Sequence, residues 1–223
     1  MKKEDVTIVL LTGLGVNHRF MMPYQLYLRA NGWKCEVVKN SLFATNNVVQ
    51  YSNDLKEVLN NCNKAYLIGF SLGGVTSAYT MASSDHYLNK VEKAFTVCSP
   101  VLSPAEWAYN NVAFKVLCNN IPVPDIVLPN ILCTLRKLGK EFQHHVLDSQ
   151  IMRSTKTKRK LHSFFHKNDK ISPPERSYFV GTKNQEIKYD YRWLPKMFHH
   201  HIACGDPRVF FDILKEIKKD IRI

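Results

Sequence analysis

The stretch YLIGFSLGGV, residues 66–75, is an apolar run that ends in a serine with glycines on both sides. A continuous apolar run of this kind is typical of a strand buried on both faces of a parallel sheet. Small residues after the serine favour a sharp turn into a helix, which projects the hydroxyl from the strand end in a strained backbone conformation. The stretch predicts a nucleophile, Ser71, at a strand-to-helix turn; a purely architectural or phosphate-holding turn is the alternative.

Strand-like and helical segments alternate along most of the chain. Strands are expected at 6–13, 33–41, 64–70, 93–99, 160–169 and in the region 184–200. Helical spacing of apolar residues or helix start signals predict helices at 19–31, 48–59, 72–84, 173–181 and from 206 onward. This alternation favours right-handed crossovers and an α/β fold whose mostly parallel central sheet is flanked by helices.

The rhythm breaks between residues 101 and 156, where prolines separate apolar, helical-looking pieces. This segment is too long for a plain connection and too apolar for a disordered one. We expect a helical cap inserted into a single domain that spans residues 1–223, because this length suits one core better than two. Its apolar residues favour an acyl substrate, although many of them would pack the cap onto the sheet in any case.

Charge and cysteine usage limit the partners and the compartment. Lys and Arg number 31 against 19 Asp and Glu, a formal net charge of +12. This surface favours anionic small molecules and a weak association with an anionic membrane surface, while nucleic acid is not expected because no recognition motif accompanies the charge.

The six cysteines are scattered without a Cys-x-x-Cys pair, and no signal peptide or membrane span is evident. We therefore expect a cytoplasmic protein without a zinc finger.

A serine nucleophile needs a base and an acid, which follow it in the order Asp or Glu, then His in this architecture. Asp169 follows an apolar strand and opens a turn, where the sites of parallel sheets gather. Three consecutive histidines, His199, His200 and His201, follow the last strand region. Because side chains alternate along a strand, the three cannot all face the serine. The residues alone leave the choice among them open.

The motifs GFSLGG, HKNDKISPP and HHHIACGDPRVFFDIL, in this order, resemble the α/β-hydrolase fold superfamily, and in particular its lipase-like and esterase-like serine hydrolases. The resemblance covers essentially the whole chain and implies hydrolysis of carboxylic esters or thioesters without a cofactor or metal. It assigns Ser71, Asp169 and His200 to a catalytic triad. It also implies an oxyanion hole made by the backbone N–H groups of Leu14 and Leu72.

The chain departs from that family at two points. The residue before the histidine is more often glycine or another small residue, so the resemblance ranks His200 first, His199 second and His201 third. The loop after the first strand commonly begins His-Gly, whereas this chain has Thr12. The expected oxyanion donor is the backbone N–H of Leu14, so threonine in place of that histidine does not remove it.

Three other interpretations remain open at this point. The same triad could transfer an acyl group to an acceptor other than water. A non-catalytic, ligand-binding member of the fold would keep the architecture and lose the reaction. His162 and His166 have the i, i+4 spacing of a helical zinc motif, but they lie in an expected strand, which argues against a metal site.

Overall fold

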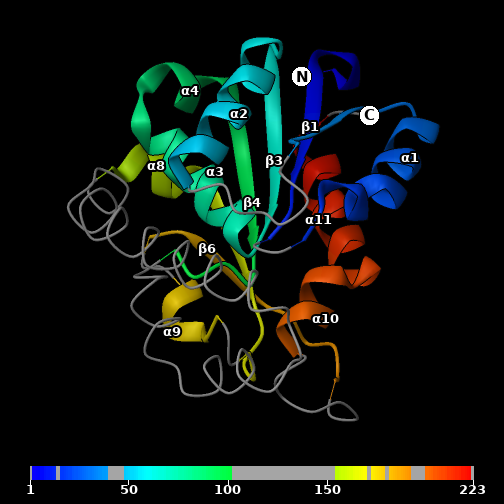
Figure 1. Ribbon diagram of the computed structural model, residues 1–223, viewed down its shortest axis with the longest axis vertical. Coiled ribbons are helices and arrows are strands. Elements are labelled where there is room, and N and C mark those ends of the chain that lie inside the picture. Colours follow the sequence, from blue (N-terminus) through cyan, green and yellow to red (C-terminus); the bar gives the residue numbers. More distant parts are fainter. Residues whose placement is uncertain are drawn as a thin grey trace, which may run out of the picture.

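The computed structural model describes residues 2–13, 16–39, 48–101, 154–169, 172–178, 181–191 and 199–221. Its centre is a six-stranded sheet with the order β2-β1-β3-β4-β5-β6, in which every neighbouring pair is parallel. The strands are β1 Val6–Leu11, β2 Lys34–Val37, β3 Lys64–Phe70, β4 Val91–Val97, β5 Leu161–Phe165 and β6 Lys183–Glu186. The α/β class with a mostly parallel sheet is therefore confirmed, and the strands run the same way in Figure 1.

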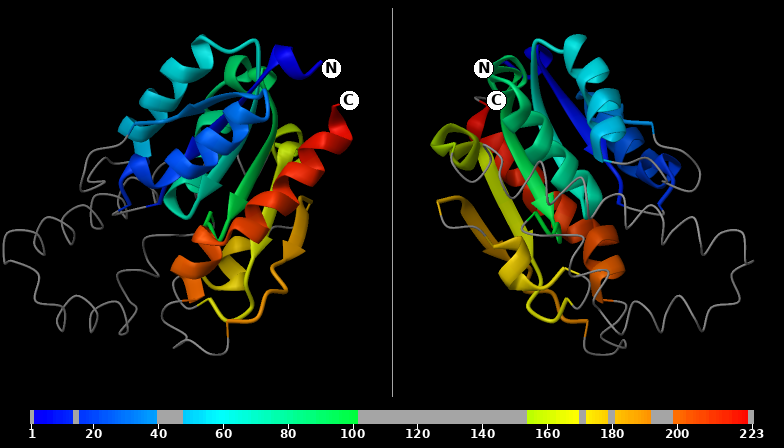
Figure 2. Two further views of the ribbon diagram at one scale, coloured as in Figure 1. Left: turned by 90° about the vertical axis from the view of Figure 1, so that its right-hand side faces the viewer. Right: turned by 60° about the vertical axis from the view of Figure 1, so that its left-hand side comes forward.

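Helices cover both faces of this sheet. They are η1 Lys3–Asp5, η2 His18–Met21, α1 Met22–Ala30, α2 Val48–Asn60, α3 Leu72–Ser83, α4 Asp85–Lys90, α8 Thr155–Lys160, α9 Pro174–Ser177, α10 His199–Gly205 and α11 Pro207–Asp220. In Figure 1, α2, α3 and α4 lie on one side of the strands and α1 and α11 on the other. Figure 2 shows α11 in front of the sheet from one direction and behind it from the other. None of the described helices has the length and apolar character to span a membrane.

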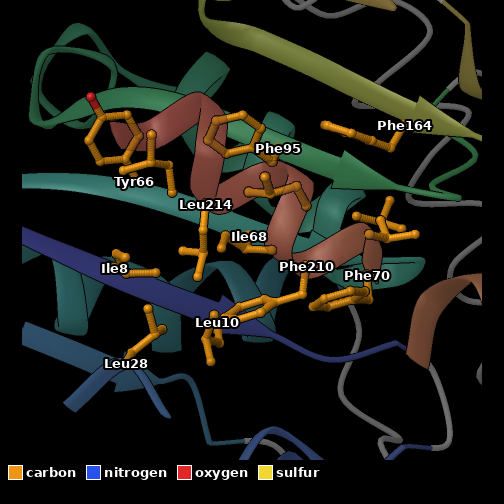
Figure 3. Packing of buried hydrophobic residues seen from close by; sticks show 14 of the residues in the cluster. Ile8, Leu10, Leu28, Tyr66, Ile68, Phe70, Phe95, Phe164, Phe210 and Leu214 are labelled. Atoms are coloured by element: carbon orange, nitrogen blue, oxygen red, sulfur yellow. The ribbon is translucent and has the colours of Figure 1, made fainter. Parts of the chain in front are cut away.

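The alternation of side chains along β1 explains these two helical layers. Val9 and Leu11 belong to one buried cluster with α2 and α3, whereas Ile8 and Leu10 belong to a second cluster with α1 and α11. Each of these four side chains is fully buried. A strand covered on both faces needs apolar residues at every position, which is why the sequence reads as a continuous apolar run. Figure 3 shows the second cluster, where side chains of α11 meet those of the sheet.

The last helix begins where the sequence predicts it. Asp206 is the N-cap, and its carboxylate accepts a hydrogen bond of 2.8 Å from the backbone N–H of Arg208. Pro207 occupies the first helical turn, where the missing N–H is no loss. The apolar face of this helix is buried against the sheet and consists of Val209, Phe210, Ile213, Leu214 and Ile217.

One expectation is wrong, and others fall outside the described residues. The region 184–200 is not a strand throughout: β6 ends at Glu186, and His199 already begins the helix α10. A short apolar run does not distinguish a strand from a buried helical segment, so pattern alone misassigned it. Residues 102–153, which hold nearly all of the expected cap, and the oxyanion residue Leu14 lie outside the described part of the chain.

Candidate active site

Ser71 occupies the turn between β3 and α3 with a backbone φ of 50°. A positive φ is strained for any residue other than glycine, and such strain concentrates at functional sites. The neighbouring glycines are required by close packing. A Cβ on Gly69 would lie 2.5 Å from the carbonyl carbon of Gly73, and a Cβ on Gly73 would lie 2.6 Å from the carbonyl oxygen of Leu11. The glycines thus let helix and strands approach closely enough to form the turn that exposes the hydroxyl.

Ser71, His200 and Asp169 lie together at the carboxyl ends of the strands. The Nε2 atom of His200 is 3.0 Å from the Oγ atom of Ser71, and its Nδ1 atom is 2.8 Å from the Oδ2 atom of Asp169. Both distances are hydrogen-bond lengths. The imidazole therefore bridges a hydroxyl and a carboxylate that are 98 positions apart in the sequence, residues 71 and 169.

The carboxylate of Asp169 is held from both sides. Its side chain is almost fully buried in the turn after β5, and its Oδ1 atom accepts a hydrogen bond of 2.8 Å from the backbone N–H of Ser172. Its own backbone N–H donates to the carbonyl of His166 at 3.0 Å. These contacts leave Oδ2 directed at His200.

The three histidines occupy the first turn of α10, so their side chains point in directions about 100° apart rather than to alternate faces of a strand. Only His200 among them is joined by hydrogen bonds to both Ser71 and Asp169 in the described structure. His199 is buried against the rings of His166 and Tyr191. His201 is exposed to solvent.

Backbone donors gather beside the hydroxyl. Leu72 is the first residue of α3, and the N–H groups of a first helical turn have no acceptor within the helix. Gly13, two residues after β1, also lies close to the serine: a Cβ placed there would be 3.1 Å from the Cβ of Ser71. Of the two expected oxyanion donors, Leu72 is among the described residues, and Leu14 lies outside them.

Tyr51 of α2 is a residue of this site that the sequence did not reveal. Its hydroxyl accepts a hydrogen bond of 3.0 Å from the backbone N–H of Thr12, and both residues are buried. Thr12 precedes Gly13, so Tyr51 fixes the start of the loop that runs beside Ser71. The two partners are 39 residues apart, and helical spacing marked Tyr51 only as a core residue.

No family model and no curated protein matches this sequence. Solved structures do match in shape. An α/β-hydrolase enzyme from the metagenome of lagoon sediments at Mar Chica, Morocco, is 18% identical with a TM-score of 0.63, over 98% of this chain and 93% of that one. A lipase-esterase related protein from Clostridium acetobutylicum is 12% identical with a TM-score of 0.61, over 95% and 94%. Polyneuridine aldehyde esterase is 19% identical with a TM-score of 0.61, over 98% and 100%.

The chain has the α/β-hydrolase fold. In this fold the turn with Ser71, the turn with Asp169 and the helix α10 all lie at the carboxyl edge of the parallel sheet, where loops from separate strands converge. The expected fold is thereby confirmed.

The environment of His200 shifts its affinity for a proton. Burial lowers the pKa of this histidine, but the negative charges of Cys204 and Asp169 and the hydrogen bond that the ring donates to Asp169 raise it, and the result is a pKa of about 9. The positive charge that the ring would carry after taking a proton is thus stabilised by its neighbours.

Two cysteines lie beside the same histidine. Cys98 follows β4 and is fully buried, and Cys204 is part of α10 and half-buried. One ligand atom of each cysteine and one of His200 lie within 4.8 Å of one another, the arrangement that can hold a metal ion. His162 and His166 are not part of this group. In the sequence these cysteines are 106 positions apart and form no Cys-x-x-Cys pair, and their proximity depends on how α10 packs against β4.

Proposed function

We propose that this protein is a serine hydrolase that cleaves carboxylic esters or thioesters of small molecules through an acyl-enzyme. The observation that carries the proposal is the continuous line of hydrogen bonds from Ser71 through His200 to Asp169. A nucleophile, a base and a group that orients the base are what acyl transfer by a hydroxyl requires. The hydrolases and esterases among the structures of similar shape support the same class of reaction.

In the first half of the reaction, the Oγ atom of Ser71 attacks the carbonyl carbon while its proton passes to Nε2 of His200. Asp169 holds the other ring nitrogen in its protonated form and stabilises the imidazolium. The carbonyl oxygen becomes an oxyanion, which the backbone N–H groups of Leu72 and Leu14 would hold. His200 then gives the proton to the departing alcohol or thiol, and the acyl group remains on Ser71.

In the second half, water takes the place of the leaving group. His200 removes a proton from the water molecule, the hydroxide oxygen attacks the acyl carbon, and the bond from that carbon to Ser71 breaks. The proton returns to Oγ and the carboxylic acid leaves. Each step uses side chains, backbone N–H groups and water, so the proposed reaction needs no cofactor.

The distribution of charge supports association with an anionic membrane surface as part of this function. Four large apolar residues of η2 and α1 are exposed to solvent: Phe20, Met22, Leu26 and Tyr27. Residues 6–35 contain Arg19, Arg29 and Lys34 and no Asp or Glu. Apolar side chains with basic neighbours suit the headgroup region of anionic lipids. Sedimentation with anionic but not neutral vesicles, lost in Phe20→Ser/Leu26→Ser, tests this part of the proposal.

A fluorophosphonate probe and a series of p-nitrophenyl esters of increasing acyl length test the reaction. We expect the probe to label Ser71 and the esters to turn over, and we expect both to be lost in Ser71→Ala. Ser83→Ala, at the far end of α3, is the matched control and should retain both. Labelling without ester turnover would point to acyl transfer to another acceptor, and a protein that no probe labels at Ser71 would overturn the proposal.

A further inference from the structure

Cys98 and Cys204 come from distant parts of the chain and lie next to His200. We propose that Cys98, Cys204 and His200 form a binding site for a thiophilic divalent cation such as Zn²⁺, and that the bound cation switches the hydrolase off. The inhibition rests on the proposed function, whereas the binding does not. Two sulfurs and one imidazole nitrogen are a donor set that zinc favours.

The geometry needs only a small adjustment to close on a cation. One ligand atom from each of the three residues lies within 4.8 Å of the other two. Zn–S bonds of about 2.3 Å and Zn–N bonds of about 2.0–2.1 Å at tetrahedral angles place ligand atoms roughly 3.5–3.8 Å apart. Side-chain rotation of the two cysteines can supply the difference. The carboxylate of Asp169 or a water molecule can complete the fourth position.

Local backbone structure holds the two thiols in place. Apart from glycines, Ser71 and Cys98 are the residues with a positive φ in the described part of the chain, and the φ of Cys98 is 47°. A strained conformation persists only where the surrounding structure imposes it. The Sγ atom of Cys204 contacts the carbonyl of Val97 at 3.8 Å, which fixes α10 against the end of β4. The end of β4 therefore leads directly to one proposed ligand, Cys98, and its last carbonyl contacts the other, Cys204.

The two thiols differ in how readily they release a proton. The hydrogen bond from Cys98 and the nearby His200 lower the pKa of the Cys204 thiol, against the effect of burial. That hydrogen bond and burial raise the pKa of Cys98 in turn. A cation binds cysteine as the thiolate, so binding to both residues would release up to two protons for each bound ion.

Binding and catalysis exclude each other because His200 has two ring nitrogens and the proposed triad uses both. Nδ1 is bonded to Asp169 and Nε2 to Ser71. Whichever nitrogen binds the cation, one of these hydrogen bonds is lost, and with it either the base or its orientation. A cation here would act as an inhibitor rather than as a cofactor.

Cadmium provides a direct test, because its thiolate complexes absorb in the ultraviolet. The full-length protein is titrated with Cd²⁺, and the charge-transfer band and the protons released are both followed. Cys204→Ser and Cys98→Ser should each lose one equivalent of tight binding, with affinity at least about 10-fold weaker, since even indirect changes around metal sites cost about 10–100-fold. Cys62→Ser is the matched control, because Cys62 belongs to the opposite hydrophobic cluster. Circular dichroism verifies that each variant is folded.

Zinc inhibition is then measured as loss of fluorophosphonate labelling at Ser71. Wild-type and Cys62→Ser protein should lose labelling as the site fills, and Cys204→Ser should resist. Equal binding of Cd²⁺ by wild type and both cysteine variants would overturn the proposal, as would tight binding that leaves labelling unchanged. If the metal-free protein does not react with the probe, the proposed hydrolase function fails, while the optical titration still decides whether the site exists.

Discussion

The Nδ1 atom of His200 lies 2.8 Å from the Oδ2 atom of Asp169, and both side chains are buried. This contact fixes which ring nitrogen carries the proton, because a carboxylate accepts a hydrogen bond and cannot donate one. When the ring is neutral, the other nitrogen, Nε2, is thereby left as an acceptor toward Ser71. The role of Asp169 in the proposed mechanism is one of orientation and charge.

Asp169→Asn should lower kcat with little change in KM. The amide has nearly the shape of the carboxylate but can present an N–H, which favours the wrong tautomer of His200. A loss on the order of 10⁴-fold is expected from the equivalent change in a serine protease. Steady-state kinetics on a p-nitrophenyl ester measure it. Asp206→Asn, which changes another buried carboxylate, serves as control and should affect stability rather than kcat; equal kcat losses in both variants would contradict the assignment.

The pH dependence of kcat/KM should report the protonation of His200. Burial opposes the shift, but Cys204 and Asp169 raise the pKa of this residue from 6.5 to about 9. A base works only when unprotonated, so activity should be low at acidic pH and rise with a midpoint above 6.5, toward about 9. Cys204→Ser removes one contribution and should move the midpoint to lower pH. A wild-type midpoint at or below 6.5 would show that these neighbours do not stabilise the imidazolium.

Tyr51→Phe should weaken catalysis through the loop beside Ser71. Without the hydroxyl, the buried N–H of Thr12 loses its acceptor, at a cost of about 1–3 kcal/mol in the free energy of unfolding. Displacement of the loop should lower kcat by about 10- to 100-fold and change KM less. Tyr66→Phe is the control, because its hydroxyl contacts Asp220 at 3.4 Å and Tyr66 lies near the start of β3, whereas Ser71 follows the end of that strand. A loss of stability with kcat unchanged would limit Tyr51 to a structural role.

His162 should make the protein sensitive to acid. It is 1% exposed and packs against the rings of Phe95 and Phe164. Burial, and then the charge of Lys183, lower its pKa from 6.5 to about 4. Below pH 6.5, His162 binds a proton in the unfolded chain but stays neutral in the folded chain. The free energy of unfolding therefore falls as the pH drops toward 4, by up to about 3 kcal/mol.

Urea unfolding at pH 7.5 and at pH 4.5 tests this expectation. His162→Phe removes the titrating group and keeps a ring in place, so it should lose less stability between the two pH values than wild type does. His86→Gln, which changes an exposed histidine, should behave like wild type. The same pH dependence in wild type and His162→Phe would assign the acid sensitivity to other groups.

Local patterns in the sequence determined much of the fold. The apolar runs that became β1 and β3, the serine between glycines and the Asp206-Pro207 start of α11 all depend on interactions within a few residues, which a pattern can express. The strand region predicted at 184–200 contains the end of β6 but was wrong at His199 and His200, which begin the helix α10, because a short segment fits a buried helix as well as a strand. The triad residues were named from their order and from the resemblance to a family.

Only the tertiary structure decided which side chains meet. On the helix α10 a step of one residue turns a side chain by about 100°, so His200 bridges Ser71 and Asp169 while His199 packs inward and His201 faces solvent. The contacts of Tyr51 with Thr12 and of Cys204 with the end of β4 join residues 39 and 107 positions apart. Such distances are set by how helices pack on the sheet, and no local pattern of residues encodes them.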